Sequence, residues 1–367
     1  MEKSVSEAGM TIKIERLSGA AGDIGWITLD AEKSLNALTL EMIRSLSRTL
    51  TAWQADPTLR CVVMNGAGEK AFCAGGDVVA LYHAMVDKDP GAIGLGDAFF
   101  EEEYALDVMI HTYPKPILCW GHGIVMGGGL GLMAGASHRV VTEKSRIAMP
   151  EITIGLYPDV GGSWFLSRML GRVGLYLGLT GASLNGADAL FLGLADFALP
   201  AVQKSDLRQA LSALNWSNED ARNHAILSGY LRKSSAGFAQ TLASSPVREH
   251  FDLIQALTDA DSVEEVVAKI TAYTGDDAWV STGAQKLKIG SPSSAAIIFE
   301  IHKRVKHLSL KEVFAFELNL SRQFLRHPDF REGVRALLID KDNSPKWNPA
   351  LISDVNKQWT DSFFELI

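Results

Sequence analysis

The chain has 367 residues, of which 47% are hydrophobic and 21% are charged. At this length a folded chain buries roughly three quarters of the surface that its unfolded form exposes, so the composition excludes disordered and collagen-like proteins. The 35 Lys and Arg against 43 Asp and Glu give a net charge of −8, which argues against a nucleic-acid partner but leaves room for one local basic patch that holds a phosphate-bearing ligand.

The first third of the chain predicts a hairpin and then alternating helices and strands. Residues 11–16 and 25–29 flank a Gly/Ala/Asp turn and predict paired strands. Thr39 stands at an N-cap position, and the apolar residues after it recur at helical spacing. The apolar run 61–64 predicts a short strand, which is followed by the loop AFCAGGD and a helix ending near Met85.

The alternation continues along the chain. Residues 97–111 predict an amphipathic helix, HRVVTE and SRIAMPE predict strands, and a helix starts near Val160. Repeated strand pairs and helices indicate an α/β fold of stacked units that share one core. Because the segment after about residue 200 contains mostly helical patterns, we expect a core region at 10–200 and a helical C-terminal region at 201–367 packed on it.

The cysteines and two segments bear on the cellular location. Cys61, Cys73 and Cys119 form no CxxC pair, so we expect no disulfide framework, no zinc knuckle and a reducing compartment. Residues 1–10 carry two glutamates and no apolar core, which fits no targeting signal and predicts a cytoplasmic protein. Residues 116–136 lack charge over a bilayer-sized length, but their seven glycines favour a strand, a turn and a helix start over a membrane helix.

Two glycine-rich segments are candidate sources of backbone donors. In AFCAGGDV (71–78) two adjacent glycines precede a helix, where backbone N–H groups converge and can donate to an oxyanion; a tight turn that only glycine permits explains the same pattern. GHGIVMGGGLG (121–131) would supply another donor. Its GLGLMA also matches a dinucleotide fingerprint with Glu151 22 residues on, but that fingerprint follows the first strand of its domain, and here several elements come first.

Two carboxylates lie in MPEITIGLYPDVGG (149–162). Glu151 and Asp159 stand on either side of an apolar segment, where carboxyl groups gain raised pKa values and serve as general acid or base. Alternatively, Glu151 makes a local cap or salt bridge. Asp159 is also expected to be the N-cap of the helix beginning at Val160, which does not exclude a catalytic task.

Other chemistry finds no support in the sequence. GxSxG, GxxxxGK[ST] and HExxH are absent, and the nine histidines lack ligand spacing, so no metal site is expected. His122 and His138 fit hydrogen-bonded structural roles. Among the acids of FEEEY, which mostly form a solvated helix face, Glu103 beside Tyr104 is the candidate for a site.

Together, AFCAGGDV, GIVMGGGLG and MPEITIGLYPDVGG resemble the enoyl-CoA hydratase/isomerase (crotonase) superfamily in order and separation. Within it the chain most resembles the 3-hydroxyisobutyryl-CoA hydrolases, whose MPE, PDVGG and late EGVRA, LIDKD and PKW motifs occur at 149–151, 158–162 and 332–347. SPSSAAI at 291–297 also matches, so the resemblance spans nearly the whole chain. It implies a crotonase-like spiral of strand–strand–helix units, with the active site in the core region, that binds an acyl-CoA thioester.

The resemblance also implies particular site residues. Hydratases carry a glutamate three residues after the middle glycine of the triplet, where this chain has Gly131, and a small residue where it has Asp159. The acid pair is therefore re-sited, as a change from C=C hydration to thioester hydrolysis would require. The implied residues are Gly76 and Gly128 for the oxyanion hole, Glu151 and Asp159 for catalysis, and Glu103, Gly128, Glu151 and Asp159 around the substrate.

The implied reaction is hydrolysis of 3-hydroxyisobutyryl-CoA, or a related short 3-hydroxyacyl-CoA, to the free acid and coenzyme A in valine catabolism. No cofactor or metal is expected, since coenzyme A is part of the substrate, and family members commonly form homo-oligomers. Glu151 either activates water or forms a mixed anhydride, and Asp159 orients the substrate hydroxyl or shuttles a proton. The alternatives are an enoyl-CoA hydratase/isomerase of fatty-acid oxidation and a non-catalytic acyl-CoA-binding protein.

Overall fold

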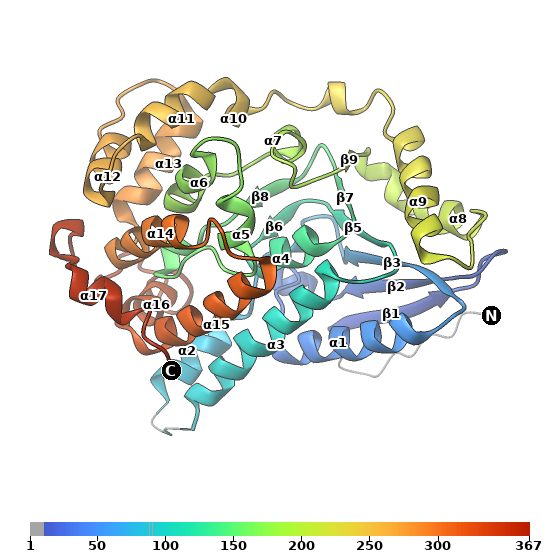
Figure 1. The fold of residues 1–367 in the computed structure, drawn as a ribbon, viewed down its shortest axis with the longest axis horizontal. Helices are drawn as coiled ribbons and strands as arrows, with labels where there is room; N and C mark the ends of the chain where they lie inside the picture. The colour runs from blue at the N-terminus through green and yellow to red at the C-terminus, as the bar shows by residue number, and fades with distance from the viewer. Residues whose placement is uncertain (1–10, 88, 90) are drawn as a thin grey trace. The chain divides into compact units, whose positions relative to one another are not determined.

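The computed structural model describes residues 11–87, 89 and 91–367, so the expectation about a targeting signal in residues 1–10 lies outside the described residues. Figure 1 labels helices and strands of the chain, which contacts between residues divide into two units. The first contains Met1–Gly76, Ala105–Ile147 and Leu184–Ser245, and the second contains Asp77–Tyr104, Ala148–Ser183 and Pro246–Ile367. Our division into 10–200 and 201–367 follows element order instead and stays a prediction.

The first unit is built on a six-stranded sheet in the order β1-β2-β3-β5-β7-β9. The expected hairpin is confirmed, because β1 pairs with β2 in antiparallel register, whereas the strands after β2 pair in parallel. The strands are β1 (Ile12–Leu17), β2 (Asp23–Leu29), β3 (Leu59–Gly66), β4 (Ala71–Cys73), β5 (Ile117–Gly121), β6 (Ile124–Met126), β7 (His138–Val141), β8 (Arg146–Ala148) and β9 (Phe197–Ala198).

The inner strands β3 and β5 are almost continuously apolar, so both of their faces must be shielded from water. Helices provide this cover. Leu207 and Leu211 of α8 and Leu227 and Leu231 of α9 pack on one face, in a cluster that includes Trp120. The helices of this unit are η1 (Glu32–Ser34), α1 (Leu40–Ala55), α4 (Gly128–Gly135), α7 (Gly186–Phe191), η3 (Ala201–Gln203), α8 (Lys204–Ser212), α9 (Asp220–Ser234) and η4 (Ala239–Thr241).

The uncharged stretch 116–136 forms β5, β6 and α4, as predicted. β4, β6 and β8 make a separate three-stranded sheet. The N-terminus of α4 lies against β4, and a Cβ on Gly129 would stand 2.3 Å from the Cys73 carbonyl oxygen, so only glycine fits this approach. Within the described part of the chain, no helix has both the length and the apolar composition that crossing a bilayer requires.

The second unit consists of helices, and α3 (Ile93–His111) runs from it into the first. Every element after β9 in the described residues is helical, as expected for the C-terminal segment. The helices are α2 (Val78–Val86), η2 (Glu151–Ile154), α5 (Gly162–Leu166), α6 (Val173–Thr180), α10 (Pro246–Glu249), α11 (Phe251–Thr258), α12 (Val263–Thr271), α13 (Ala278–Ile289), α14 (Pro292–Arg304), α15 (Leu310–Arg326), α16 (Pro328–Val334), π-helical η5 (Arg335–Ile339), η6 (Ile352–Asp354) and α17 (Lys357–Ser362).

Candidate active site

Two glycine loops are neighbours in the first unit. Gly75 has a φ of +120°, and its carbonyl accepts from Leu38 N at 2.8 Å, which holds the segment running into Gly76. Gly128 is the first residue of α4, so no carbonyl within that helix pairs with its N–H. A Cβ on Gly75 would lie 4.0 Å from Gly128 N. The structure therefore brings together the two loops that were predicted to supply donors.

Three carboxyl groups form a cluster in the second unit. Glu103 lies on α3, Glu151 begins η2, and Asp159 lies in the loop between η2 and α5. They are only 2%, 5% and 5% exposed. Both glutamates lie within electrostatic range of Asp159, so the three acids named from the sequence are buried in one region of this unit.

Burial sets the protonation of these acids. It raises the pKa of Glu103 and the pKa of Glu151 well above the ordinary value, and the negative charge of Asp159 raises both further. Burial also raises the pKa of Asp159 to about 6, although the hydrogen bond from Tyr104 opposes this shift. Buried acids with raised pKa values are typical of sites that transfer protons.

Two oxygens of this cluster are without hydrogen-bond partners among the described residues: Glu103 Oε1 and Glu151 Oε2. Buried polar atoms in folded proteins are almost always paired, because an unpaired one loses its hydration without compensation. These two oxygens are therefore positioned to bind a polar group of a substrate or a water molecule.

A chain of hydroxyl groups holds Asp159. Tyr104 Oη donates to Asp159 Oδ2 at 2.6 Å and lies 2.6 Å from Ser321 Oγ. Tyr157 Oη donates to the Glu317 carbonyl at 2.9 Å and also lies 2.9 Å from Ser321 Oγ. Since Tyr104 uses its proton on Asp159, Ser321 donates to Tyr104, and the network fixes the orientation of the Asp159 carboxyl.

Glu317 braces the loop that follows Asp159. Its carboxyl oxygens accept from Gly161 N at 2.8 Å and from Ser163 N at 2.9 Å. The side chain is fully buried, and burial raises its pKa to about 8. Sequence reasoning missed Glu317, Ser321 and Tyr157. Glu317 could have been noticed in the sequence because it is an acid at a position of the buried, otherwise mostly apolar stripe of α15.

Glutamine at Glu317 should destabilise the chain at mildly acidic pH, because its NH₂ group cannot accept from a backbone N–H as the second carboxyl oxygen of Glu317 does, which leaves a buried N–H unpaired. We expect a loss of about 1–3 kcal/mol in the free energy of unfolding near pH 5. The folded-state pKa is raised to about 8 from 4.5. The contribution of Glu317 to the free energy of unfolding is therefore fully present at low pH and is lost as pH rises toward 8. The glutamine variant has no such pH dependence at this position.

The difference between native protein and Glu317→Gln should accordingly shrink toward pH 8.5. Urea unfolding at both pH values measures it. An equal difference at the two pH values would contradict the raised pKa of Glu317.

Some expectations for side chains are wrong and others are confirmed. Asp159 is not an N-cap: α5 begins at Gly162, its N-cap residue is Gly161, and no side chain caps it. The reason is that the Asp159 carboxyl turns to the Tyr104 hydroxyl instead. The two histidines are structural as predicted, with His122 Nε2 3.0 Å from Gly68 O and His138 Nε2 2.9 Å from Ser228 Oγ.

A metal site and a dinucleotide site are the two other kinds of site to compare with the described residues. In the described ranges, no group of His, Cys, Asp and Glu side chains could hold a metal ion. The GLGLMA match lies inside α4 rather than on a turn after the first strand.

The sequence matches the enoyl-CoA hydratase/isomerase family over residues 24–364. The chain belongs to this family. The resemblance inferred from the three motifs is confirmed, and so is the α/β crotonase fold. The buried acids and glycine loops are therefore features of a crotonase-family chain.

Among its relatives, the mitochondrial 3-hydroxyisobutyryl-CoA hydrolase of Xenopus tropicalis is 40% identical over 351 residues, covering 95% of this chain and 88% of the relative. The enzyme of that name from Danio rerio is 40% identical over 361 residues, covering 98% and 90%. Among solved structures, a carnitinyl-CoA dehydratase from Mycobacterium thermoresistibile and an enoyl-CoA hydratase from Rhodobacter sphaeroides both give a TM-score of 0.83 at 33% identity. They cover 96% of this chain and 96% and 97% of their own chains.

Proposed function

We propose that this chain hydrolyses the thioester of 3-hydroxyisobutyryl-CoA, or of a closely related short 3-hydroxyacyl-CoA, to the free acid and coenzyme A. Its place would be valine catabolism. The names of relatives at 40% identity over nearly the full length support this reaction.

The observation that carries the proposal is the placement of acids. Glu151 and Asp159 share one buried cluster, whereas Gly131, at the position of the first hydratase glutamate, is a buried glycine inside α4. Adding water across a double bond needs a second carboxylate at that position. Thioester hydrolysis instead needs one carboxylate near the carbonyl carbon and a group for the 3-hydroxyl, which Glu151 and Asp159 provide.

In this mechanism the N–H groups of Gly76 and Gly128 donate to the thioester oxygen as it gains negative charge. One donor of this kind typically contributes about 10² to 10³ in rate. Backbone donors at glycine suit this task because no side chain separates them from the substrate.

Glu151 in its ionised form acts by one of two balanced routes. As a general base it takes a proton from water, whose oxygen attacks the carbonyl carbon, and the C–S bond breaks to release the thiolate, which takes a proton. As a nucleophile it attacks the carbonyl carbon itself, releases the thiolate and leaves an anhydride that water hydrolyses. Asp159 accepts a hydrogen bond from the substrate 3-hydroxyl or shuttles a proton, and Glu103 lies beside the substrate.

Replacing Asp159 with asparagine should lower kcat by about 10- to 100-fold, as for one lost charge-assisted hydrogen bond. The amide oxygen still accepts from Tyr104, so the melting temperature should change little. Removing the Asp159 charge should also lower the pKa of Glu151 and move the acidic limb of the kcat/KM profile to lower pH. Steady-state kinetics across pH tests this, and an unshifted limb with native kcat would contradict it.

The native pH profile gives a further prediction. Both routes need ionised Glu151, and burial with the Asp159 charge favours its protonated form. We expect kcat/KM to increase as pH rises through the raised pKa, with the acidic limb well above pH 4.5, the ordinary glutamate value. A profile that is flat from about pH 5 to about pH 8 would contradict this expectation.

One alternative has an observation in its favour, since two structural neighbours at 33% identity are named a dehydratase and a hydratase. A panel of acyl-CoA thioesters separates the functions, with release of free thiol and loss of enoyl absorbance measured together. Thiol release from 3-hydroxyisobutyryl-CoA with little hydration of crotonyl-CoA is expected. Rapid hydration without thiol would establish the alternative, and binding without turnover would indicate a non-catalytic acyl-CoA-binding protein.

We further propose that the reaction uses no cofactor, and that the protein self-associates and binds neither nucleic acid nor membrane. A cytoplasmic location also stays a proposal, supported by the three buried cysteines, none of which forms a disulfide among the described residues. The relatives quoted above are named mitochondrial, which leaves this location to be tested by fractionation.

A further inference from the structure

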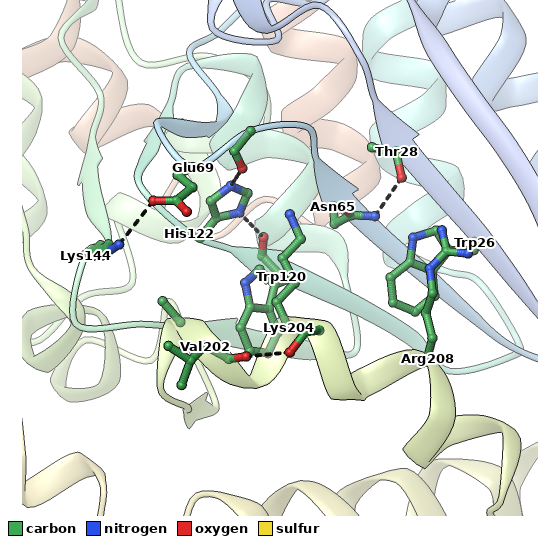
Figure 2. Close-up of a pocket in the computed structure, with 13 residues that line it drawn as sticks. Trp26, Thr28, Asn65, Glu69, Trp120, His122, Lys144, Val202, Lys204 and Arg208 are labelled. Atoms are coloured by element: carbon green, nitrogen blue, oxygen red, sulfur yellow. Dashed lines mark hydrogen bonds and ion pairs between the residues drawn. The ribbon is translucent and has the colours of Figure 1, made fainter.

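A cavity of about 510 Å³ lies in the first unit (Figure 2). Thr28, Asn65 and Trp120 line it from the carboxyl-end halves of β2, β3 and β5, and Lys204 and Arg208 line it from α8. Its volume is in the range of small-molecule sites, and the carboxyl edge of parallel strands is where α/β sheets commonly bind ligands.

Lys204 gives this cavity an uncompensated positive charge. Its Nζ donates to the Gly66 carbonyl at 2.7 Å, and no carboxylate pairs with it among the described residues. Burial lowers the pKa of Lys204 to about 8, and no nearby acid opposes the shift. A partly buried ammonium normally has a counter-charge, because desolvation without one is costly.

The other charged groups around the cavity are paired. Lys144 lies 3.5 Å from Glu69, and Arg208 pairs with Glu15. His122 is buried, with Nε2 3.0 Å and Nδ1 3.4 Å from backbone carbonyl oxygens, and burial lowers its pKa to about 4, so it is neutral at pH 7. An anion that enters the cavity would therefore contact one unpaired cation, and no unpaired acid among the described residues would repel it.

The remaining lining is suited to an apolar body. Trp120 is 1% exposed, and its Nε1 donor has no partner in the described part of the chain. Val202 is 78% exposed although it is apolar. Trp120 of β5, Val202 of η3 and Lys204 of α8 are among the residues that line the cavity (Figure 2).

We propose that this cavity binds a small organic anion, a carboxylate or phosphate monoester with a compact apolar body. The anionic group pairs with the Lys204 ammonium, and the body lies against Trp120 and Val202. This proposal uses none of the residues assigned to the thioester chemistry, so it holds whether or not that proposal does.

Titration calorimetry of the full chain with benzoate, phenyl phosphate and uncharged phenol tests the site. At least one anion should bind with a Kd below about 1 mM and phenol at least about tenfold more weakly, and the better anion identifies the head group. Lys204→Met should raise that Kd about tenfold or more, whereas the control Lys144→Gln, at an exposed cation that is already paired, should change it less than about threefold. No binding of either anion, equal binding of phenol, or an unchanged Kd in Lys204→Met would each overturn the proposal.

The native protein supplies a second test that needs no folded Lys204 variant. Benzoate does not titrate above neutral pH. The other titratable or charged side chains that line the cavity with Lys204 are Glu69, His122, Lys144 and Arg208. Because the ammonium form binds the anion, affinity for benzoate or phenyl phosphate should fall about tenfold between about pH 7 and about pH 9.5. The same fall should persist in Lys144→Gln, which removes the neighbouring lysine. An affinity that stays constant over this range would overturn the role of Lys204.

Discussion

Glutamine in place of Glu151 should lower kcat by about 10²- to 10⁴-fold, the usual contribution of a general base. Glu151 is 5% exposed, and its Oε2 is unpaired among the described residues, so this carboxyl is available to water or to a thioester carbon. Glutamine has nearly the same volume and cannot take up the proton. The loss should therefore fall on kcat with little change in the melting temperature.

A matched control is Glu101→Gln, on the same helix as Glu103. The Glu101 side chain is 59% exposed and pairs with Arg322, so turnover should stay within about twofold of native. A Glu151→Gln protein that is folded and as active as this control would remove Glu151 from both proposed routes.

Single turnover in ¹⁸O-water separates those routes. If Glu151 is the nucleophile and water attacks the enzyme side of the anhydride, label enters the peptide that contains Glu151, whereas a general base sends it only to the product acid. Mass spectrometry of that peptide measures the label. Label in the Glu151 carboxyl would contradict the general-base route. If no label enters the Glu151 carboxyl, the anhydride route holds only where water attacks the acyl side. Trapping the anhydride with hydroxylamine would reveal that case.

Features that depend on near neighbours in sequence could be predicted. Thr39 caps α1, accepting from Met42 N at 3.2 Å, because N-cap chemistry involves residues three positions apart. The uncharged stretch 116–136 forms β5, β6 and α4 because glycine density disfavours one long helix there. Two of the three clustered acids, Glu151 and Asp159, also lie in one of the motif segments on which the family resemblance rested.

Features that depend on contacts between distant segments could not be predicted from the sequence. Asp159 precedes a helix in a sequence that fits a cap, but its partner is the hydroxyl of Tyr104, 55 residues earlier. Glu317 holds Gly161 and Ser163 from more than 150 residues away. The anion cavity likewise draws Lys204 and Trp120 from separate segments. No local pattern encodes these contacts, because burial and pairing are decided only when the segments pack.

Proline in place of Gly128 should lower kcat by about 10²- to 10³-fold by removing one oxyanion donor. Gly128 is the first residue of α4, the position where a helix tolerates proline best, because its N–H has no partner within the helix. The preceding Gly127 already has a φ of 49°, a conformation that glycine adopts without strain. The substitution therefore removes the donor and leaves α4 in place.

Gly128→Ala is the matched control, because alanine keeps the N–H and adds only a methyl group. We expect Gly128→Ala to lose less of the native kcat than Gly128→Pro, with circular dichroism showing folded protein in both. Turnover of 3-hydroxyisobutyryl-CoA measures the difference. If both variants lose activity equally, the space at Gly128 matters rather than its N–H, and if folded Gly128→Pro keeps near-native kcat, the second oxyanion donor lies on another residue.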